Sequence, residues 1–165
     1  MRTEPPLVLC AGIIVLDEVF IVDHFPPPGG KTEAREFFTV NGGCAANAAV
    51  GVARLGGRAA LAGPLGGPEG ADLNGDQVLA AVRCEHVGVS GCLRISGAPT
   101  PLSAIAIDGR GERMIVTYRD PRIAAAAPPD PEELVRLADV VLADNRFPNF
   151  VLPICKAARD RKSVV

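Results

Sequence analysis

One glycine-rich segment of this sequence combines residue types that suit the binding of a polar ligand. Gly42 and Gly43 carry no Cβ, so their backbone can approach a ligand closely. Residues 45–55 are rich in alanine, with apolar residues at helical spacing, and Gly56 is expected to end that helix. The N–H groups of the two glycines then lie near a helix N-terminus, which favours a polar or anionic group. Asn47, one turn into the helix, can donate to and accept from hydroxyl groups.

Three charged residues stand where they could reach the same ligand. Asp17 ends an apolar stretch that begins at Val8, Lys31 follows a Pro/Gly loop, and Arg146 lies just past the strand expected at 140–143. Ligands of open α/β sheets bind at the carboxyl ends of such strands. Each position also has a structural alternative. Asp17 and Asn47 would then be caps, the two glycines a tight turn, Arg146 a surface ion pair, and Lys31 a solvated side chain.

The rest of the chain alternates strands and helices, which predicts βαβ units around a parallel sheet. A hairpin and an early pair of strands do not fit that layer, and they are expected to form a separate small sheet. Residues 63–70 are expected to be a Gly/Pro loop and residues 124–129 a low-complexity linker. The expected strands are 7–11, 13–23, 34–40, 58–62, 102–107, 112–118 and 140–143. The expected helices are 45–55, 71–87, one beginning at Pro131 after the cap Asp130, and 150–161.

Composition and charge exclude several classes of protein. The formal net charge is −2, with 17 basic and 19 acidic residues. Nucleic-acid binding would need a basic face, and nothing in this charge balance suggests one. The apolar stretch 7–22 is too short and too charged to span a bilayer. Five cysteines without a C-x-x-C pair argue against zinc and disulfides and favour reduced thiols in a cytoplasmic protein. His24 and His86 have no partners at ligand spacing, so no metal site is expected.

The glycine-rich segment closely resembles a known signature. Gly42-Gly43-x-Ala45-x-Asn47-x-Ala49, then six residues to Gly56 and nine to Gly66, resembles the first signature of the PfkB (ribokinase-like) carbohydrate kinases. The segment Val8-Leu-Cys-Ala-Gly-Ile-Ile-Val-Leu-Asp17 is similar to that family's opening strand and sugar-binding aspartate. The resemblance covers nearly the whole chain.

The resemblance implies an α/β fold with a ribokinase-like central parallel sheet, helices on both faces, and a small β-sheet lid. Residues 1–165 would be the N-terminal part of one such domain, with lid segments at about 13–40 and 102–118. The family's second signature, a Gly-Ala-Gly-Asp region with the catalytic aspartate, does not occur here. The C-terminal half is therefore expected to be missing, with no catalytic residue in this fragment and no activity of the fragment alone.

By the same resemblance, the whole protein would be an ATP-dependent phosphotransferase, with ATP and Mg²⁺, that acts on a sugar hydroxyl. Asp17, Gly42, Gly43 and Asn47 would bind the sugar. The family often dimerises through its lid, so a homodimer is expected, with neither a nucleic-acid nor a membrane partner.

Three stretches point within the family to the sulfofructose kinase and ketohexokinase branch: 29–35, 103–118 and 140–146. In sulfofructose kinases, a lysine and an arginine at positions like Lys31 and Arg146 hold the sulfonate, and a third residue, usually Asn, corresponds to Thr117. Cys44 replaces the usual Gly or Lys of that branch. A sulfo-sugar or a neutral ketose is thus the expected substrate.

Two other functions remain open. One is a non-catalytic remnant that binds sugar or dimerises. The other is a nucleoside kinase of the same fold, which would need aromatic or apolar residues around the base. The charged hairpin residues Arg110, Glu112 and Arg113 do not suggest such a pocket.

Overall fold

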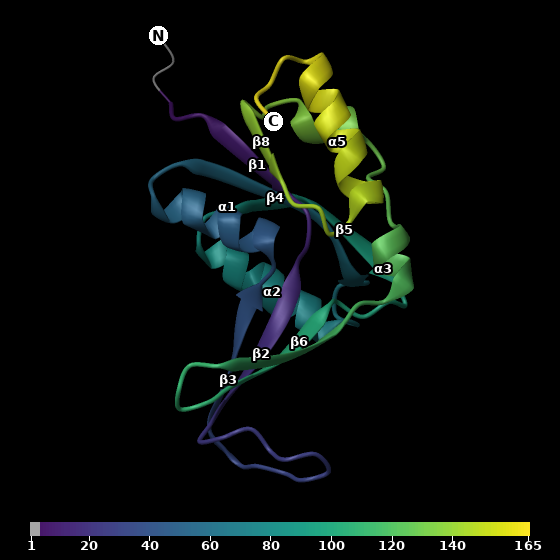
Figure 1. Ribbon diagram of the computed structural model, residues 1–165. Coiled ribbons are helices and arrows are strands. Elements are labelled where there is room, and N and C mark those ends of the chain that lie inside the picture. Colours follow the sequence, from purple (N-terminus) through teal and green to yellow (C-terminus); the bar gives the residue numbers. More distant parts are fainter. Residues whose placement is uncertain (1–3) are drawn as a thin grey trace.

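The computed structural model describes residues 4–165, and these residues form two four-stranded sheets, one of which has helices on both faces (Figure 1). The main sheet has the order β5-β4-β1-β8, and all its pairings are parallel. This parallel sheet with its helices is the α/β layer that the sequence predicts. The strands of the main sheet are β1 (Leu7–Ala11), β4 (Arg58–Gly67), β5 (Gly88–Ser96) and β8 (Val140–Ala143).

Helices cover both faces of the main sheet because β1 alternates its apolar side chains between them. Leu9 and Ala11 belong to a core with residues of α3, α4 and α5, whereas Cys10 belongs to a second core with α1 and α2. Figure 1 shows α1 and α2 on one side of the sheet and α5 on the other. The helices are α1 (Cys44–Arg54), α2 (Leu73–Cys84), α3 (Pro121–Ala125), α4 (Pro131–Val135) and α5 (Pro148–Asp160).

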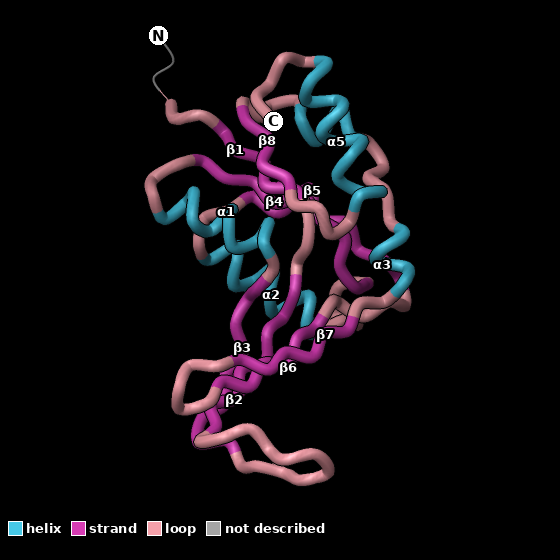
Figure 2. Tube along the Cα trace, in the orientation of Figure 1, coloured by secondary structure: helices cyan, strands magenta, loops and turns pink. Residues whose placement is uncertain are grey.

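The second sheet has the order β3-β2-β6-β7 and extends away from the main sheet (Figure 2). β2 and β6 pair in parallel at its centre, while β3 and β7 pair antiparallel at its edges. The hairpin expected around residues 108–111 joins β6 to β7. β2, β3, β6 and β7 therefore make one small sheet apart from the main sheet, and β3 runs to Gly42, two residues beyond the segment expected at about 13–40. Its strands are β2 (Val15–Val22), β3 (Ala34–Gly42), β6 (Leu102–Ile107) and β7 (Arg113–Tyr118).

Three local expectations were wrong. The Gly/Pro stretch after Ala62 is not a loop: β4 continues to Gly67, and the strand is buried there. Its glycines serve close packing, because a Cβ on Gly63 would lie 2.2 Å from the Gly12 carbonyl oxygen. No strand was expected at β5, whose residues are only partly buried. The expected linker after Ala124 overlaps α3, which Asp120 caps by accepting from Arg122 N.

The cap expected for the helix that begins at Pro131 agrees with the structure, and the helix expected at 150–161 begins two residues earlier. Asp130 caps α4 through Glu133 N, with Pro131 at the first helical position. The short β-segment at the end of the chain is a single parallel bridge from Val164 to Val140 on the outer edge of β8. No helix among residues 4–165 is long and apolar enough to cross a membrane.

Candidate sugar-binding site

The site begins where the chain leaves the main sheet between β1 and β2. Ile13 N donates to Asp144 Oδ2 at 2.8 Å, and Asp144 N donates to the Ala11 carbonyl oxygen at 3.1 Å. A Cβ on Gly12 would lie 2.2 Å from Asp144 Oδ2, so only glycine fits beside this carboxylate. Asp144, directly after β8, therefore fixes the turn that directs the chain into the second sheet. Sequence reasoning missed this role, although the position of Asp144 at a strand's carboxyl end was a usable signal.

The carboxylate of Asp17 lies against the end of β3. Asp17 is the third residue of β2, within the second sheet rather than at the end of the opening strand, and it pairs with Val40 across the β2–β3 ladder. A Cβ on Gly42 would lie 2.0 Å from Asp17 Oδ2. Any side chain at Gly42 would displace the carboxylate, so the glycine is required by this contact.

Gly43 joins β3 to α1. Its φ is +97°, a conformation that favours glycine, and a Cβ there would lie 2.3 Å from the Ile13 carbonyl oxygen. Gly43 is the N-cap residue of α1 and has no side chain to accept from the first-turn amides. Asn47 N donates to the Gly43 carbonyl oxygen at 2.9 Å, and Asn47 is exposed. Asp17, Gly42 and Gly43 thus lie together beside an uncapped helix N-terminus, and Asn47 lies one turn into that helix.

The register of the second sheet extends this site. Val40, Asp17, Ser103 and Thr117 occupy one row across β3, β2, β6 and β7. Residues in one row share a face of the sheet, so the Ser103 and Thr117 hydroxyls lie on the same face as the Asp17 carboxylate. Ser103 is buried. Sequence reasoning did not select Ser103, although a single serine in an apolar strand was a signal.

The two candidate cations follow different elements of the fold. Arg146 is exposed and follows β8, and its backbone N donates to Asp144 Oδ1 at 2.9 Å, so it belongs to the same end of the sheet as Gly12. Lys31 is exposed in the loop between β2 and β3, which lies beyond the far end of the second sheet (Figure 2). Lys31 and Arg146 are thus carried by different elements, the β2–β3 loop and the segment after β8, and their joint contact with one end of a sugar stays a prediction.

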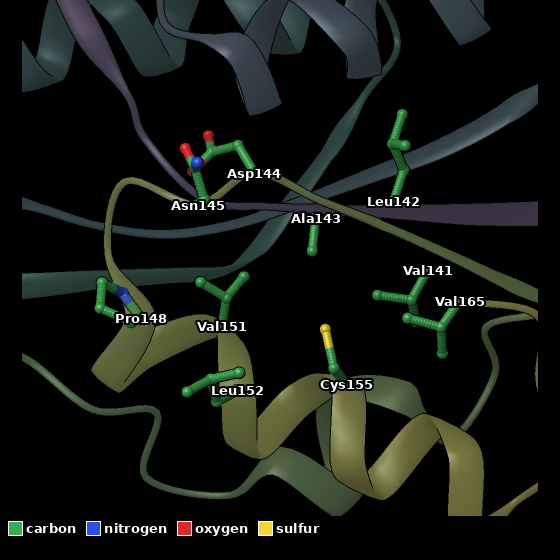
Figure 3. Close-up of a pocket in the computed structure, with 10 residues that line it drawn as sticks. All are labelled: Val141, Leu142, Ala143, Asp144, Asn145, Pro148, Val151, Leu152, Cys155 and Val165. Carbon is green, nitrogen blue, oxygen red and sulfur yellow. The ribbon is translucent and has the colours of Figure 1, made fainter.

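A pocket of about 630 Å³ lies between β8 and α5, and Asp144 and Asn145 are among the residues at its border (Figure 3). Figure 3 shows Val141 and Ala143 of β8 facing Val151 and Cys155 of α5, whereas Asp144 points away from α5. Val165 also lines it. Because its lining is mostly apolar and lies on the outer edge of β8, we do not assign the sugar to this pocket.

The buried thiols are protonated and therefore poor nucleophiles. Burial raises the pKa of the Cys10 thiol to about 11 and that of Cys92 to about 12, so both stay protonated at neutral pH. Cys44 is exposed directly after Gly43, at the start of α1. All five cysteines are free, and within residues 4–165 no cluster of His, Cys, Asp and Glu could hold a metal ion.

The family model for the pfkB family carbohydrate kinases matches residues 5–159. The chain belongs to this family. Among curated proteins, this pfkB chain is 34% identical over 133 residues to a probable fructokinase-2 of Arabidopsis thaliana and 32% identical over 136 residues to a fructokinase of Solanum tuberosum. The matches cover 78% and 80% of this chain but 39% and 41% of those proteins. The pfkB chain thus spans about two fifths of the length of these relatives.

Solved structures show the same fold. A putative ribokinase from Agrobacterium tumefaciens is 36% identical to the pfkB chain with a TM-score of 0.87, and the match covers 96% of this chain and 51% of that one. A ribokinase from Arabidopsis thaliana, solved with ribose and ATP, is 22% identical with a TM-score of 0.77 and is matched over 52% of its length. At that identity the likeness concerns the fold alone.

Proposed function

We propose that this chain supplies the sugar-binding part of an ATP-dependent kinase that phosphorylates a hydroxyl group of a ketohexose, with fructose as the first candidate. The observation that carries the proposal is the carboxylate of Asp17 held against the Gly42–Gly43 turn at the start of α1. The fructokinase relatives support the choice of fructose.

Each group of the site has a chemical task in this proposal. The Asp17 carboxylate accepts hydrogen bonds from two sugar hydroxyls, as an ionised acid does well. The amides at the uncapped start of α1 donate to a sugar oxygen, and the Asn47 amide can donate and accept. The second sheet, which carries Asp17 and Ser103, acts as the lid that excludes water from the reacting hydroxyl.

ATP is the expected phosphoryl donor, and Mg²⁺ the expected metal. In kinases, the metal and an anion hole neutralise charge on the transferred group, and a carboxylate takes the hydroxyl proton. The residues described here do not fit these tasks: they form no metal-binding cluster, and the sequence has no Gly-Ala-Gly-Asp region. We therefore assign no residue of this chain to Mg²⁺ or to the catalytic base. A sugar-binding product without phosphotransfer remains the second candidate.

The neutral ketose is preferred over the sulfo-sugar because the curated relatives are fructokinases and because different elements carry Lys31 and Arg146. Arg146 alone lies at the end of the sheet where Asp144 and Gly12 meet. A guanidinium there suits an anionic substituent on the sugar. One cation, however, would distinguish a sulfo-sugar from a neutral ketose less well than two cations would.

A second copy of this chain is the proposed macromolecular partner. The outer strands of the second sheet expose apolar side chains, among them Phe37 at 57% and Val116 at 67% of their surface. An apolar sheet with open edges favours association, and a symmetric dimer would bury the same strands in both copies. The cytoplasm is the proposed location.

The test is a substrate screen on the complete gene product, with ADP release as the readout. Fructose, 6-deoxy-6-sulfofructose, ribose and adenosine are compared, and fructose is expected to have the highest kcat/KM. A preference for the sulfo-sugar that disappears in Arg146→Ala would replace fructose by the sulfonate. A preference for adenosine would replace the sugar by a nucleoside. Sugar binding without ADP release would leave only the binding function.

A further inference from the structure

A buried polar network joins the main sheet to the base of the second sheet. Among residues 4–165, four polar or charged residues are buried, and Asp72 and Thr100 are two of them, with 9% and 1% of their surfaces exposed. The Thr100 hydroxyl donates to Asp72 Oδ2, and Thr100 N donates to Asp72 Oδ1 at 3.3 Å. Asp72 also caps α2 by accepting from Gly75 N at 3.2 Å. One carboxylate thus ties the start of α2 to the segment that leads into β6.

The same network reaches the end of β4. Gly66 N donates to the Thr100 hydroxyl oxygen at 2.9 Å, and Arg94 of β5 donates to the Gly66 carbonyl oxygen at 2.9 Å. A Cβ on Gly66 would lie 2.4 Å from both Asp72 Oδ2 and Thr100 N. A Cβ on Gly75 would lie 2.5 Å from Asp72 Oδ2 and from Thr100 Oγ1. The network therefore requires glycine at both positions, including the last glycine of the sequence signature.

Thr100 connects directly to the strands that carry the candidate site. Leu16 N in β2 donates to the Pro101 carbonyl oxygen at 3.0 Å. Ser103, three residues after Thr100, pairs in register with Asp17. A shift of Thr100 would therefore move β6 and, through the β2–β6 ladder, the Asp17 carboxylate. Buried hydrogen bonds of a charged group resist such a shift, because breaking one leaves a buried partner unsatisfied.

We propose that Asp72 and Thr100 form a clamp that positions the second sheet, and with it Asp17, relative to the start of α1. Both are positioning residues, since neither lies in the row of polar residues around Asp17. The functional half of this inference rests on the proposed sugar site, whereas the structural half does not. The ion pair of Arg94 with Asp76 supports the clamp from the side of β5.

The structural half is tested by amide hydrogen exchange on the full chain. Thr100→Val keeps the shape of the side chain but removes the hydroxyl, and Thr100→Ser keeps the hydroxyl. Thr100→Val is expected to speed exchange in β2 and β6 by about tenfold or more, the equivalent of one hydrogen bond to a charged group, and β1 should change less. Thr100→Ser should restore slow exchange. Asp130→Asn, which alters the cap of α4 only, is the control and should leave β2 and β6 unchanged. Equal acceleration in β1, or none in β2 and β6, would overturn the clamp.

The functional half is tested by fructose kinetics of the complete gene product. Thr100→Val should raise the KM for fructose about tenfold while the KM for ATP stays near that of the wild type, and Thr100→Ser should bring the fructose value back. An unchanged fructose KM together with faster exchange in β2 and β6 would refute the link to Asp17. If the wild type phosphorylates no sugar, the proposed function fails, and the exchange measurement still decides the clamp.

Discussion

Asp17 and Gly42 meet across the β2–β3 ladder, and their contact accounts for two of the residues that sequence reasoning selected. Gly42 is needed because a side chain would occupy the place of the Asp17 carboxylate, and Gly43 because its φ is positive and its Cα lies close to the Ile13 carbonyl. Neither glycine needs a ligand to explain it. The test of ligand binding therefore falls on Asp17 itself.

Replacing Asp17 by alanine should impair use of the sugar far more than use of ATP. Loss of charge-assisted hydrogen bonds, each about 1.5–3 kcal/mol, should lower kcat/KM for fructose by roughly 10²-fold while the KM for ATP stays near the wild-type value. Steady-state kinetics of the complete gene product measures both. Glu18→Ala is the matched control, because Glu18 is the neighbouring acid on the opposite face of β2. If both variants keep wild-type kinetics for fructose, Asp17 has only a structural role.

Alanine substitutions distinguish a glycine that is needed for close packing from a glycine that has open space beside it. Gly66→Ala should destabilise the chain by about 1–3 kcal/mol, because its Cβ would overlap Asp72, Thr100 and the Ala98 carbonyl. Gly51→Ala should instead stabilise it by about 0.4–1 kcal/mol, because Gly51 lies within α1 and its Cβ would meet open space. Urea denaturation of both variants gives the comparison. Equal changes in the free energy of unfolding would contradict the close packing around Gly66.

At the scale of elements, apolar stretches and turn residues in the sequence predicted several of the strands. The apolar run Leu7–Ala11 predicted β1, and the turn at residues 108–111 between two apolar stretches predicted β6 and β7, although β7 is exposed. The glycines of β4 were taken for a loop because a local reading cannot see that Gly63 packs against the backbone at Gly12. Asp144 and Ser103 were missed for a related reason: their places in the site follow from strand pairing with β1 and β2. The position of Lys31 likewise depends on the length and direction of the β2–β3 loop.

The start of α3 should make stability depend on acid pH. Hydrogen bonds from the Arg122 side chain and backbone lower the pKa of Asp120 from 3.8 to about 2. A folded-state pKa below the unfolded value means that Asp120 stabilises the fold above about pH 4 and that this contribution is lost as the pH falls toward 2. Thermal melts between pH 5 and 2 should show a steeper loss for the wild type than for Asp120→Asn. Parallel curves would contradict the assignment of this loss to Asp120.

At the scale of the whole molecule, the second sheet exposes large apolar side chains that a second copy of the chain could cover. All six residues of β7 are exposed, including Ile115 and Val116, whose side chains point to opposite faces. Light scattering should show a dimer for the wild type, and Ile115→Lys or Val116→Lys should give a monomer with unchanged circular dichroism. The variant that dissociates identifies the buried face. A wild type that is monomeric at every concentration would refute association through this sheet.

Hydrogen exchange of the complete gene product, with and without fructose, tests most directly whether the sugar binds between the second sheet and the start of α1. Fructose should slow exchange together in peptides that cover residues 15–18 and 42–47, because one ligand would contact both elements. Peptides of α5 beside the pocket of Figure 3 should not change. Protection confined to β8 and α5, or no protection near Asp17 and Gly43 at saturating fructose, would contradict the site described here.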